Sequence, residues 1–157
     1  MSVRRQPPKI SAKEAAVGYL SRRDHAEREL QQKLKMRGYS EQDVQEAIDF
    51  CQDYQWLDDA RYAAMAVRNG VTKGWGKLRI QQEMKMKGVH ELCIKQALAD
   101  AEVDWFEQAK SVAQRKFGNQ PMDTPKEKAR RLRFMQSRGF DFEQIRYALS
   151  VDDEYEG

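Results

Sequence analysis

The sequence predicts an all-α protein, an elongated array of three tandem three-helix repeats with about nine helices. Three similar stretches occur at Lys35–Ile48, Lys85–Leu98 and Gln136–Leu149, and their spacing of about 50 residues is near the upper end for stacked repeats. Apolar residues recur at helical spacing on both sides of a glycine in each copy. No stretch alternates between apolar and polar residues for long enough to predict a strand.

The glycine of each copy, at Gly38, Gly88 and Gly139, is predicted to end one helix in the left-handed conformation. The next residue should then pack back on the residue four before the glycine and forward on the following helix. The residues at these places are apolar in every copy: Leu34, Tyr39 and Val44; Met84, Val89 and Ile94; Met135, Phe140 and Ile145. Ser40 and Asp141 are good N-caps for the following helices, whereas His90 is a poor one.

A further helix is predicted in front of each copy, over residues 11–21, 58–71 and 105–117. Asp58 or Asp59 can cap the second of these. The middle helix of the third repeat should begin at the sequence TPKE, where Thr124 caps, Pro125 takes the first helical position and Glu127 closes a capping box.

The predicted organisation has five parts: a flexible basic arm over residues 1–10, repeats over 11–55, 56–102 and 103–151, and an acidic tail over 152–157. Trp56, Trp75 and Trp105 lie near the repeat boundaries, so we expect them to pack at the joints. An exposed anchor at Trp75 is the less favoured alternative.

Composition narrows the classes of function. The 157 residues include 28 Lys and Arg, 25 Asp and Glu, and 40% hydrophobic residues, which is typical of a soluble folded protein. There is no apolar run of membrane-spanning length and no secretory signal, and the two separated cysteines favour a cytoplasmic location. His90 and Cys93 lie one helical turn apart, but with two histidines and two cysteines in the chain a closed zinc site would need Asp or Glu ligands from elsewhere. We therefore favour a buried cysteine and a surface histidine, and expect no metal and no cofactor. No nucleophile elbow or phosphate-binding glycine loop is present, so we expect no enzymatic activity.

Charge is divided unevenly along the chain. Seventeen of the 28 basic residues lie in the three predicted middle helices, which carry a net +12 against −9 for the rest of the chain. Residues 40–54 hold five acidic residues and no Lys or Arg. If the repeats stack in one orientation, the basic helices form a stripe that attracts a polyanion or an acidic protein. The alternative is that these cations only solvate exposed faces. The acidic helix argues against a DNA-reading helix-turn-helix, although phosphate contact by the basic helices is left open.

Three motifs in order resemble the RecX family, the bacterial regulators of the RecA recombinase. They are SRRDHAERELQQKL near Ser21–Leu34, WLDDARYA at Trp56–Ala63 with KGWG at Lys73–Gly76 and a KG ending at Gly88, and RKFG with KEKARRLRFMQSRGF up to Phe140. The resemblance covers roughly Ala15–Leu149. It implies an all-helical repeat protein that lies in the groove of the RecA filament on single-stranded DNA. Such proteins inhibit ATP hydrolysis, strand exchange and co-protease activity, and so limit homologous recombination and modulate the SOS response.

The interpretation that follows is a monomeric cytoplasmic regulator without a cofactor, whose partner is RecA as a filament. The residues predicted to bind the filament or DNA are Lys73, Lys77, Arg79, Lys85, Lys87, Arg130, Arg131, Arg133, Lys33 and Arg37. Arg61 of the LDDARYA motif is instead expected to be structural, paired with Asp58 or a nearby acid. Two alternatives stay open: a general protein that binds DNA phosphates without recombinase contact, and a helical scaffold for another acidic partner.

Overall fold

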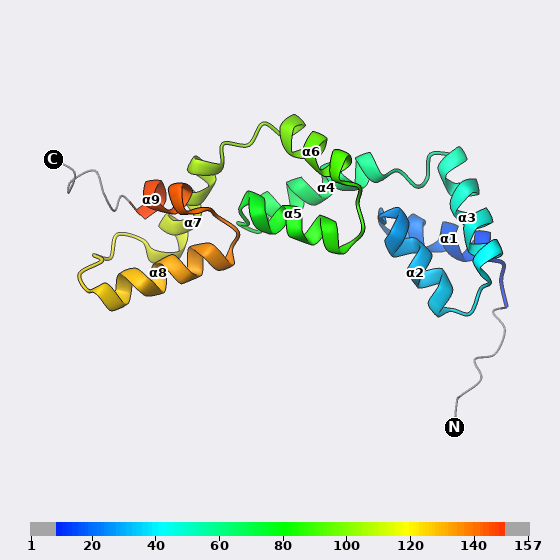
Figure 1. Cartoon of the computed structure of the whole chain (residues 1–157), viewed down its shortest axis with the longest axis horizontal. Helices are drawn as coiled ribbons and strands as arrows, with labels where there is room; N and C mark the ends of the chain where they lie inside the picture. The colour runs from blue at the N-terminus through cyan, green and yellow to red at the C-terminus, as the bar shows by residue number, and fades with distance from the viewer. Residues whose placement is uncertain (1–8, 150–157) are drawn as a thin grey trace, which may run out of the picture. The chain divides into compact units, whose positions relative to one another are not determined.

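The computed structural model describes residues 9–149, and within that range it contains nine α-helices and no strand (Figure 1). The helices are α1 (Ala12–Arg22), α2 (Glu27–Met36), α3 (Glu41–Asp53), α4 (Asp59–Thr72), α5 (Lys77–Met86), α6 (Glu91–Asp100), α7 (Trp105–Phe117), α8 (Pro125–Ser137) and α9 (Phe142–Leu149). The all-α prediction is confirmed. Most of the predicted N-terminal arm and all of the acidic tail lie outside the described residues.

The chain divides into two compact units, each described here by itself. The first runs to Ala63 and includes Met84–Lys95. Its core lies where α1, α2 and α3 pack together (blue to cyan in Figure 1). Ala15 and Ala16 of α1 are buried there with Leu30 and Leu34 of α2. Small alanine side chains allow close helix packing, so α1 sits against the buried face of α3.

The second unit consists of Ala64–Glu83 and the chain from Gln96 onward. Here α7 packs on α9, and α8 also contacts α9 (yellow to red in Figure 1). Ala109 and Ala113 of α7 are buried with Met135 of α8 and Ile145 of α9. In both the first and the third repeat, the first helix therefore contributes buried alanines that allow close packing against the third helix.

The three repeated glycines have φ angles of +99° at Gly38, +79° at Gly88 and +95° at Gly139. The amide of the following residue donates to the carbonyl of the residue four before the glycine, at 3.1 to 3.4 Å. Each glycine amide donates to the carbonyl three residues earlier, at 2.9 to 3.0 Å. This is the double hydrogen-bond pattern of a Schellman helix end.

Helix caps agree with the sequence except at two positions. Ser40, Thr124 and Asp141 each accept the amide three residues on. His90, predicted to be a poor cap, accepts the amide of Leu92 through Nδ1 at 3.1 Å. Glu127 does not close a capping box, because its carboxylate binds Arg130 and Arg131 instead.

The middle helices are shorter than the basic segments from which they were predicted. Arg22 ends α1, Arg23 is its C-cap, and Lys73 lies in the turn before α5. Arg37 and Arg138 are the C-caps of α2 and α8, and Lys87 follows α5. These cations therefore lie at or beside helix ends and not inside the middle helices. A cation interacts favourably with the C-terminal carbonyls of a helix only when it lies in the last turn.

Candidate partner-binding surface

In the second unit, the turn at Gly139 closes directly on the start of α5. The amide of Gly76 donates to the carbonyl of Arg138 at 2.6 Å, and the amide of Leu78 donates to the carbonyl of Gly139 at 3.0 Å. Amides at a helix start and carbonyls at a helix end have no partner in their own helix. This joint satisfies both sets at once, with favourable alignment of the helix dipoles.

Two glycines make this close approach possible. A Cβ atom on Gly139 would lie 2.4 Å from the backbone nitrogen of Arg79, and one on Gly76 would lie 2.4 Å from the carbonyl oxygen of Gly139. Gly74, with φ of +81°, makes the turn that leads into α5. The KGWG motif at Lys73–Gly76 is therefore a docking site for the next repeat, a role that the sequence did not reveal.

In the first unit, the turn at Gly88 lies against the start of α2 in a similar way. A Cβ atom on Gly88 would lie 2.3 Å from Cδ of Arg28. Lys87 Nζ is 3.0 Å from Oε2 of Glu29, which is also bound by Arg23 at 2.8 Å. Glu29 is only 8% exposed. Burial opposes ionisation, yet the hydrogen bonds from Arg23 and Lys87 outweigh it and lower the pKa of Glu29 to about 2.

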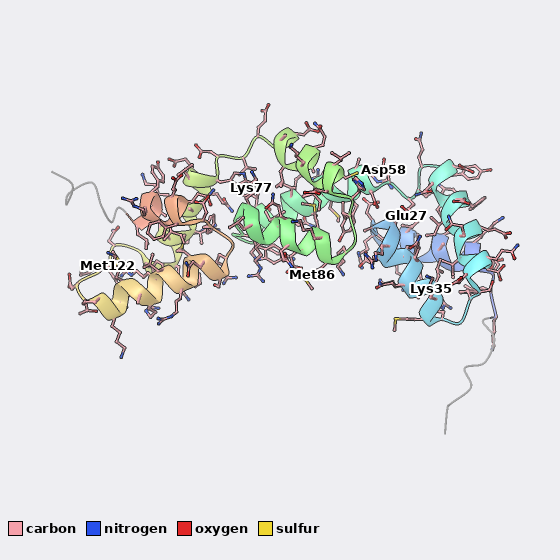
Figure 2. All side chains as sticks on the ribbon, viewed as in Figure 1. Glu27, Lys35, Asp58, Lys77, Met86 and Met122 are labelled. Carbon is pink, nitrogen blue, oxygen red and sulfur yellow. The ribbon has the colours of Figure 1, made fainter. Side chains whose placement is uncertain are left out.

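The LDDARYA motif completes the same joint. Asp58 accepts the amide of Arg61 and so caps α4, while Asp59 accepts the amide of Glu27 at 2.8 Å. Figure 2 shows Glu27 and Asp58 close to each other where α2 and α4 begin. Arg61 binds Asp24 at 3.0 Å and the carbonyls of Gln55 and Trp56. The predicted structural role of Arg61 is confirmed, although its acidic partner is Asp24 rather than Asp58.

His25, for which no role was predicted, is buried beside this joint at 2% exposure. Its Nδ1 lies 3.1 Å from the carbonyl of Arg23 and its Nε2 lies 2.9 Å from Nζ of Lys33. Because an ammonium group can only donate, Nε2 accepts and Nδ1 carries the proton, so the ring is neutral. Burial lowers the pKa of His25 below its ordinary value, which agrees with this tautomer.

These contacts separate the ten cations predicted to bind a partner into groups. Lys33 and Lys87 have internal partners in His25 and Glu29. Arg130 binds Glu127 but keeps about half of its side chain exposed. Arg131 is 6% exposed and its guanidinium binds Glu127 and the carbonyls of Gln120 and Pro121. We correct the prediction for Arg131, because a side chain committed in this way is not available to a partner.

Aromatic rings hold three more of the predicted cations. Lys73 and Arg79 lie over the ring of Trp75, at 4.8 and 4.3 Å from its centroid. Arg37 lies 5.7 Å from the centroid of Tyr19. Trp75 is partly buried and its carbonyl accepts a hydrogen bond from Gln108, which favours the predicted packing role over the alternative of an exposed anchor. Cation–π contacts of this kind orient the charge without neutralising it.

Lys77, Lys85 and Arg133 remain as cations that make no ion pair or side-chain hydrogen bond with any described residue. Exposed apolar side chains accompany them: Leu78 is 51% exposed and Met86 is 71% exposed, and Met36 is 64% exposed beside Lys35. Figure 2 places Lys35 and Met86 at the C-terminal ends of α2 and α5. The two exposed methionines occupy the same place in the repeat, because a Lys-Met pair precedes both Gly38 and Gly88 in the sequence. This repetition was the sequence signal for them.

Comparison with known proteins identifies this arrangement. Family models match the chain in order as the first RecX three-helix domain at residues 12–51, the second at 58–98 and the third at 102–149. The chain belongs to the RecX family. Proteins named regulatory protein RecX are 51% identical in Vibrio parahaemolyticus, over 98% of this chain and 99% of the relative, and 39% identical in Halorhodospira halophila, over 92% and 89%.

Solved RecX structures share the fold. A crystal structure of a regulatory protein RecX superposes with a TM-score of 0.76 at 25% identity, covering 90% of this chain and 72% of the other. RecX from Lactobacillus salivarius gives a TM-score of 0.73 at 20% identity, covering 90% and 96%. The LDDARYA and KGWG stretches, on which the sequence resemblance was based, take part in the two joints described above.

Over residues 9–149, none of the helices combines the length and the apolar character needed to cross a lipid bilayer. In the same range, no three His, Cys, Asp or Glu side chains are grouped so that they could hold a metal ion.

Proposed function

We propose that this chain binds the RecA filament on single-stranded DNA and inhibits its ATP hydrolysis, strand exchange and co-protease activity. The observation that carries the proposal is the match of all three domains, in order, to a family of regulatory proteins. By inhibiting these RecA activities, the protein limits homologous recombination and modulates the SOS response. It acts as a cytoplasmic monomer and not as an enzyme.

The proposed contact surface consists of the cations that remain available for a partner. Its centre is the start of α5, with Lys73, Lys77 and Arg79, and Arg130 and Arg133 of the same unit also belong to it. Lys85, near the other end of α5, is an available cation of the first unit. Exposed Leu78 and Met86 supply apolar contact area among these charges, and buried apolar area at an interface contributes more affinity than rim ion pairs do. Arg131 is no longer part of the surface, and Lys33 and Lys87 contribute only in addition to their internal contacts with His25 and Glu29. Arg37, like Lys73 and Arg79, keeps its charge beside an aromatic ring.

Repetition explains how weak contacts can select a filament. Once one domain binds a filament subunit, the contacts of the others become intramolecular, and such linkage raises affinity by roughly 10² to 10⁴-fold. A free RecA monomer offers no such neighbours. Because exposed cations carry much of the attraction, raised salt should weaken inhibition.

The triple variant Lys77→Glu/Lys85→Glu/Arg133→Glu tests this surface. These side chains have no internal partner among residues 9–149, so the helical circular dichroism signal should be unchanged. The concentration that half-inhibits DNA-dependent ATP hydrolysis by RecA should rise about tenfold or more, as expected for the loss and reversal of several exposed ion pairs. The variant Lys9→Glu/Lys95→Glu/Lys110→Glu changes net charge equally at other places and should inhibit normally. Equal loss in both variants would show that only overall charge matters.

The alternative of a general protein that binds DNA phosphates predicts a different titration. Inhibition by filament contact should be substoichiometric to RecA even when all the DNA is covered by the recombinase. Inhibition by DNA coverage should follow the amount of free DNA and disappear when none is free. The second pattern would contradict direct recombinase contact.

A further inference from the structure

The outer face of α3 carries acidic side chains without cationic partners. Glu46, Asp49 and Asp53 follow one another at spacings of three and four residues, so they lie on one side of the helix. Val44, Ala47, Ile48 and Cys51 are buried on the opposite side. Among the described residues, no acid of α3 is in an ion pair, and Glu46 and Asp49 accept only from the neighbouring Gln42 and Gln45.

An exposed aromatic cluster lies at the end of this row. The rings of Tyr54 and Trp56 stack at 5.2 Å between centroids with an interplanar angle of 22°, and both contact Phe50. Tyr54 is 60% exposed and Trp56 is 43% exposed. Trp56 was predicted to pack at a joint: its carbonyl accepts from Arg61 there, whereas its ring is partly exposed and stacks on Tyr54.

The backbone holds this cluster in place. The amides of Trp56 and Leu57 both donate to the carbonyl of Cys51, at 2.9 and 3.1 Å. Arg61 binds the carbonyls of Gln55 and Trp56 at 2.9 and 2.8 Å and is itself anchored on Asp24. Gln55 has φ of +60°, a conformation that a non-glycine residue keeps only when its surroundings impose it. A ligand that binds these rings thus has little backbone ordering to bring about.

The combination of charges and rings selects the chemistry of the occupant. Phosphate groups would meet the carboxylates of Glu46, Asp49 and Asp53, and residues 40–54 include no Lys or Arg, so nucleic acid is disfavoured. An arginine side chain fits both features, because its guanidinium stacks on aromatic faces and binds carboxylates in a bidentate manner. Within the chain, Lys13 already places its ammonium group 5.2 Å from the ring of Phe50.

We propose that the carboxylates of α3 together with the Tyr54–Trp56 stack form a docking surface for an arginine-bearing basic segment of a partner protein. We call it the acidic aromatic surface. It goes beyond the proposed function, since it shares no residue with the cationic surface and attracts ligands of the opposite charge. The protein would thus have a second interaction surface, on its first repeat.

The test uses the full chain and two synthetic nine-residue peptides that alternate glycine with four arginines or with four lysines. Binding is followed by the NMR signals of the α3 amides and of the Trp56 indole, assigned with Trp56→Phe. The arginine peptide should shift these signals and should bind at least threefold more tightly than the lysine peptide. Tyr54→Ala/Trp56→Ala and Asp49→Asn/Asp53→Asn should each weaken its binding at least fivefold, whereas the matched exposed pair Glu14→Gln/Glu91→Gln should not.

Four results would overturn the proposal. They are the absence of shifts, equal affinity for both peptides with no effect of Tyr54→Ala/Trp56→Ala, the same shifts caused by a single-stranded oligonucleotide, and shifts that grow with protein concentration alone, which would make the occupant a second copy. Exposed side chains are changed, so unaltered melting temperatures will show that the variants fold. Inhibition of RecA by the variants is measured separately and tests only the cationic surface.

Discussion

Gly139→Ala will lower the free energy of unfolding by about 3 kcal/mol, whereas Gly38→Ala will lower it by about 1 kcal/mol. Both glycines have nearly the same φ, +95° and +99°, so the cost of the left-handed conformation is shared. They differ in what a Cβ atom would meet. At Gly38 nothing lies within 4 Å, whereas at Gly139 the backbone nitrogen and Cβ of Arg79 lie 2.4 Å away.

The extra loss at Gly139 has a definite structural origin. To admit a methyl group, the turn must move away from the start of α5 and give up the hydrogen bonds from Gly76 and Leu78. Each such bond contributes about 0.5–1.5 kcal/mol net, and its loss also leaves amides of a helix start unsatisfied. Urea denaturation followed by circular dichroism measures the difference between the two variants.

Gly76→Ala is an independent check on the same joint, because its added methyl group would meet the carbonyl of Gly139 from the other side. It has no contribution from a positive φ, so it should destabilise by about 2 kcal/mol, which is the part of the Gly139→Ala effect that comes from the joint. Equal, small effects at Gly38, Gly76 and Gly139 would show that the joint is not closed in solution.

Glu29→Gln will destabilise the protein by about 2 kcal/mol at pH 7 and will remove the part of the acid-induced loss of stability between pH 4.5 and pH 2 that is due to Glu29. The folded-state pKa of Glu29 is about 2, below its ordinary 4.5, so its stabilising effect is complete above pH 4.5 and is lost as the pH falls toward 2. A shift of this size corresponds to roughly 3 kcal/mol. We expect less, because Arg23 and Lys87 are 45% and 44% exposed and solvent screens them.

His25 adds an earlier phase to the same acid dependence. Its pKa is lowered by burial in the folded protein, so the unfolded chain takes up a proton first as the pH falls below about 6.5. Stability should therefore decline in both variant and wild-type protein from pH 6.5 downward. Below pH 4.5 the wild type should decline more steeply than the variant, because both proteins keep Glu127, whose pKa is also lowered to about 2 by its hydrogen bonds with Arg130 and Arg131. Urea midpoints at pH 7, 5 and 3 measure both phases.

Glu46→Gln is the matched control for Glu29→Gln, because it removes one carboxylate from an exposed face with no ion pair to any described residue. Its stability at pH 7 should change by less than about 0.5 kcal/mol. A Glu29→Gln variant that behaved like this control would contradict the stabilising role of the buried Glu29 carboxylate with Arg23 and Lys87.

Features that depend on a few consecutive residues were predictable from the sequence. Helical periodicity and short-range hydrogen bonding predict the helices in front of each glycine and the caps at Ser40 and Thr124. They also predict the helix-ending turns in which Val89 and Phe140 follow a glycine. The family resemblance rested on motifs that the structure places at the joints. The cationic residues were also visible, because charge is a property of composition.

The state of each charged side chain was not predictable in this way. Arg131 and Arg133 lie two residues apart in a basic helix, yet the first is buried on Glu127 and the loop at Gln120 and Pro121, and the second is exposed. Glu29 belongs to a basic segment by sequence, but it is the acid to which Arg23 and Lys87 bind. The second glycine of KGWG, Gly76, is predicted from the sequence as a turn residue, but its contact partner, Gly139, is 63 residues away.

The sequence by itself determined the order of the helices, the glycine turns between them and that the same unit occurs three times, because those properties depend on interactions within about one helical turn. Only the tertiary structure decided which cations are free, which glycines bring two backbones together, and that Trp56 faces solvent. These properties depend on pairs such as Lys87 with Glu29 or Arg61 with Asp24, which are 58 and 37 residues apart. No local pattern specifies such pairs, since they exist only once the repeats have docked.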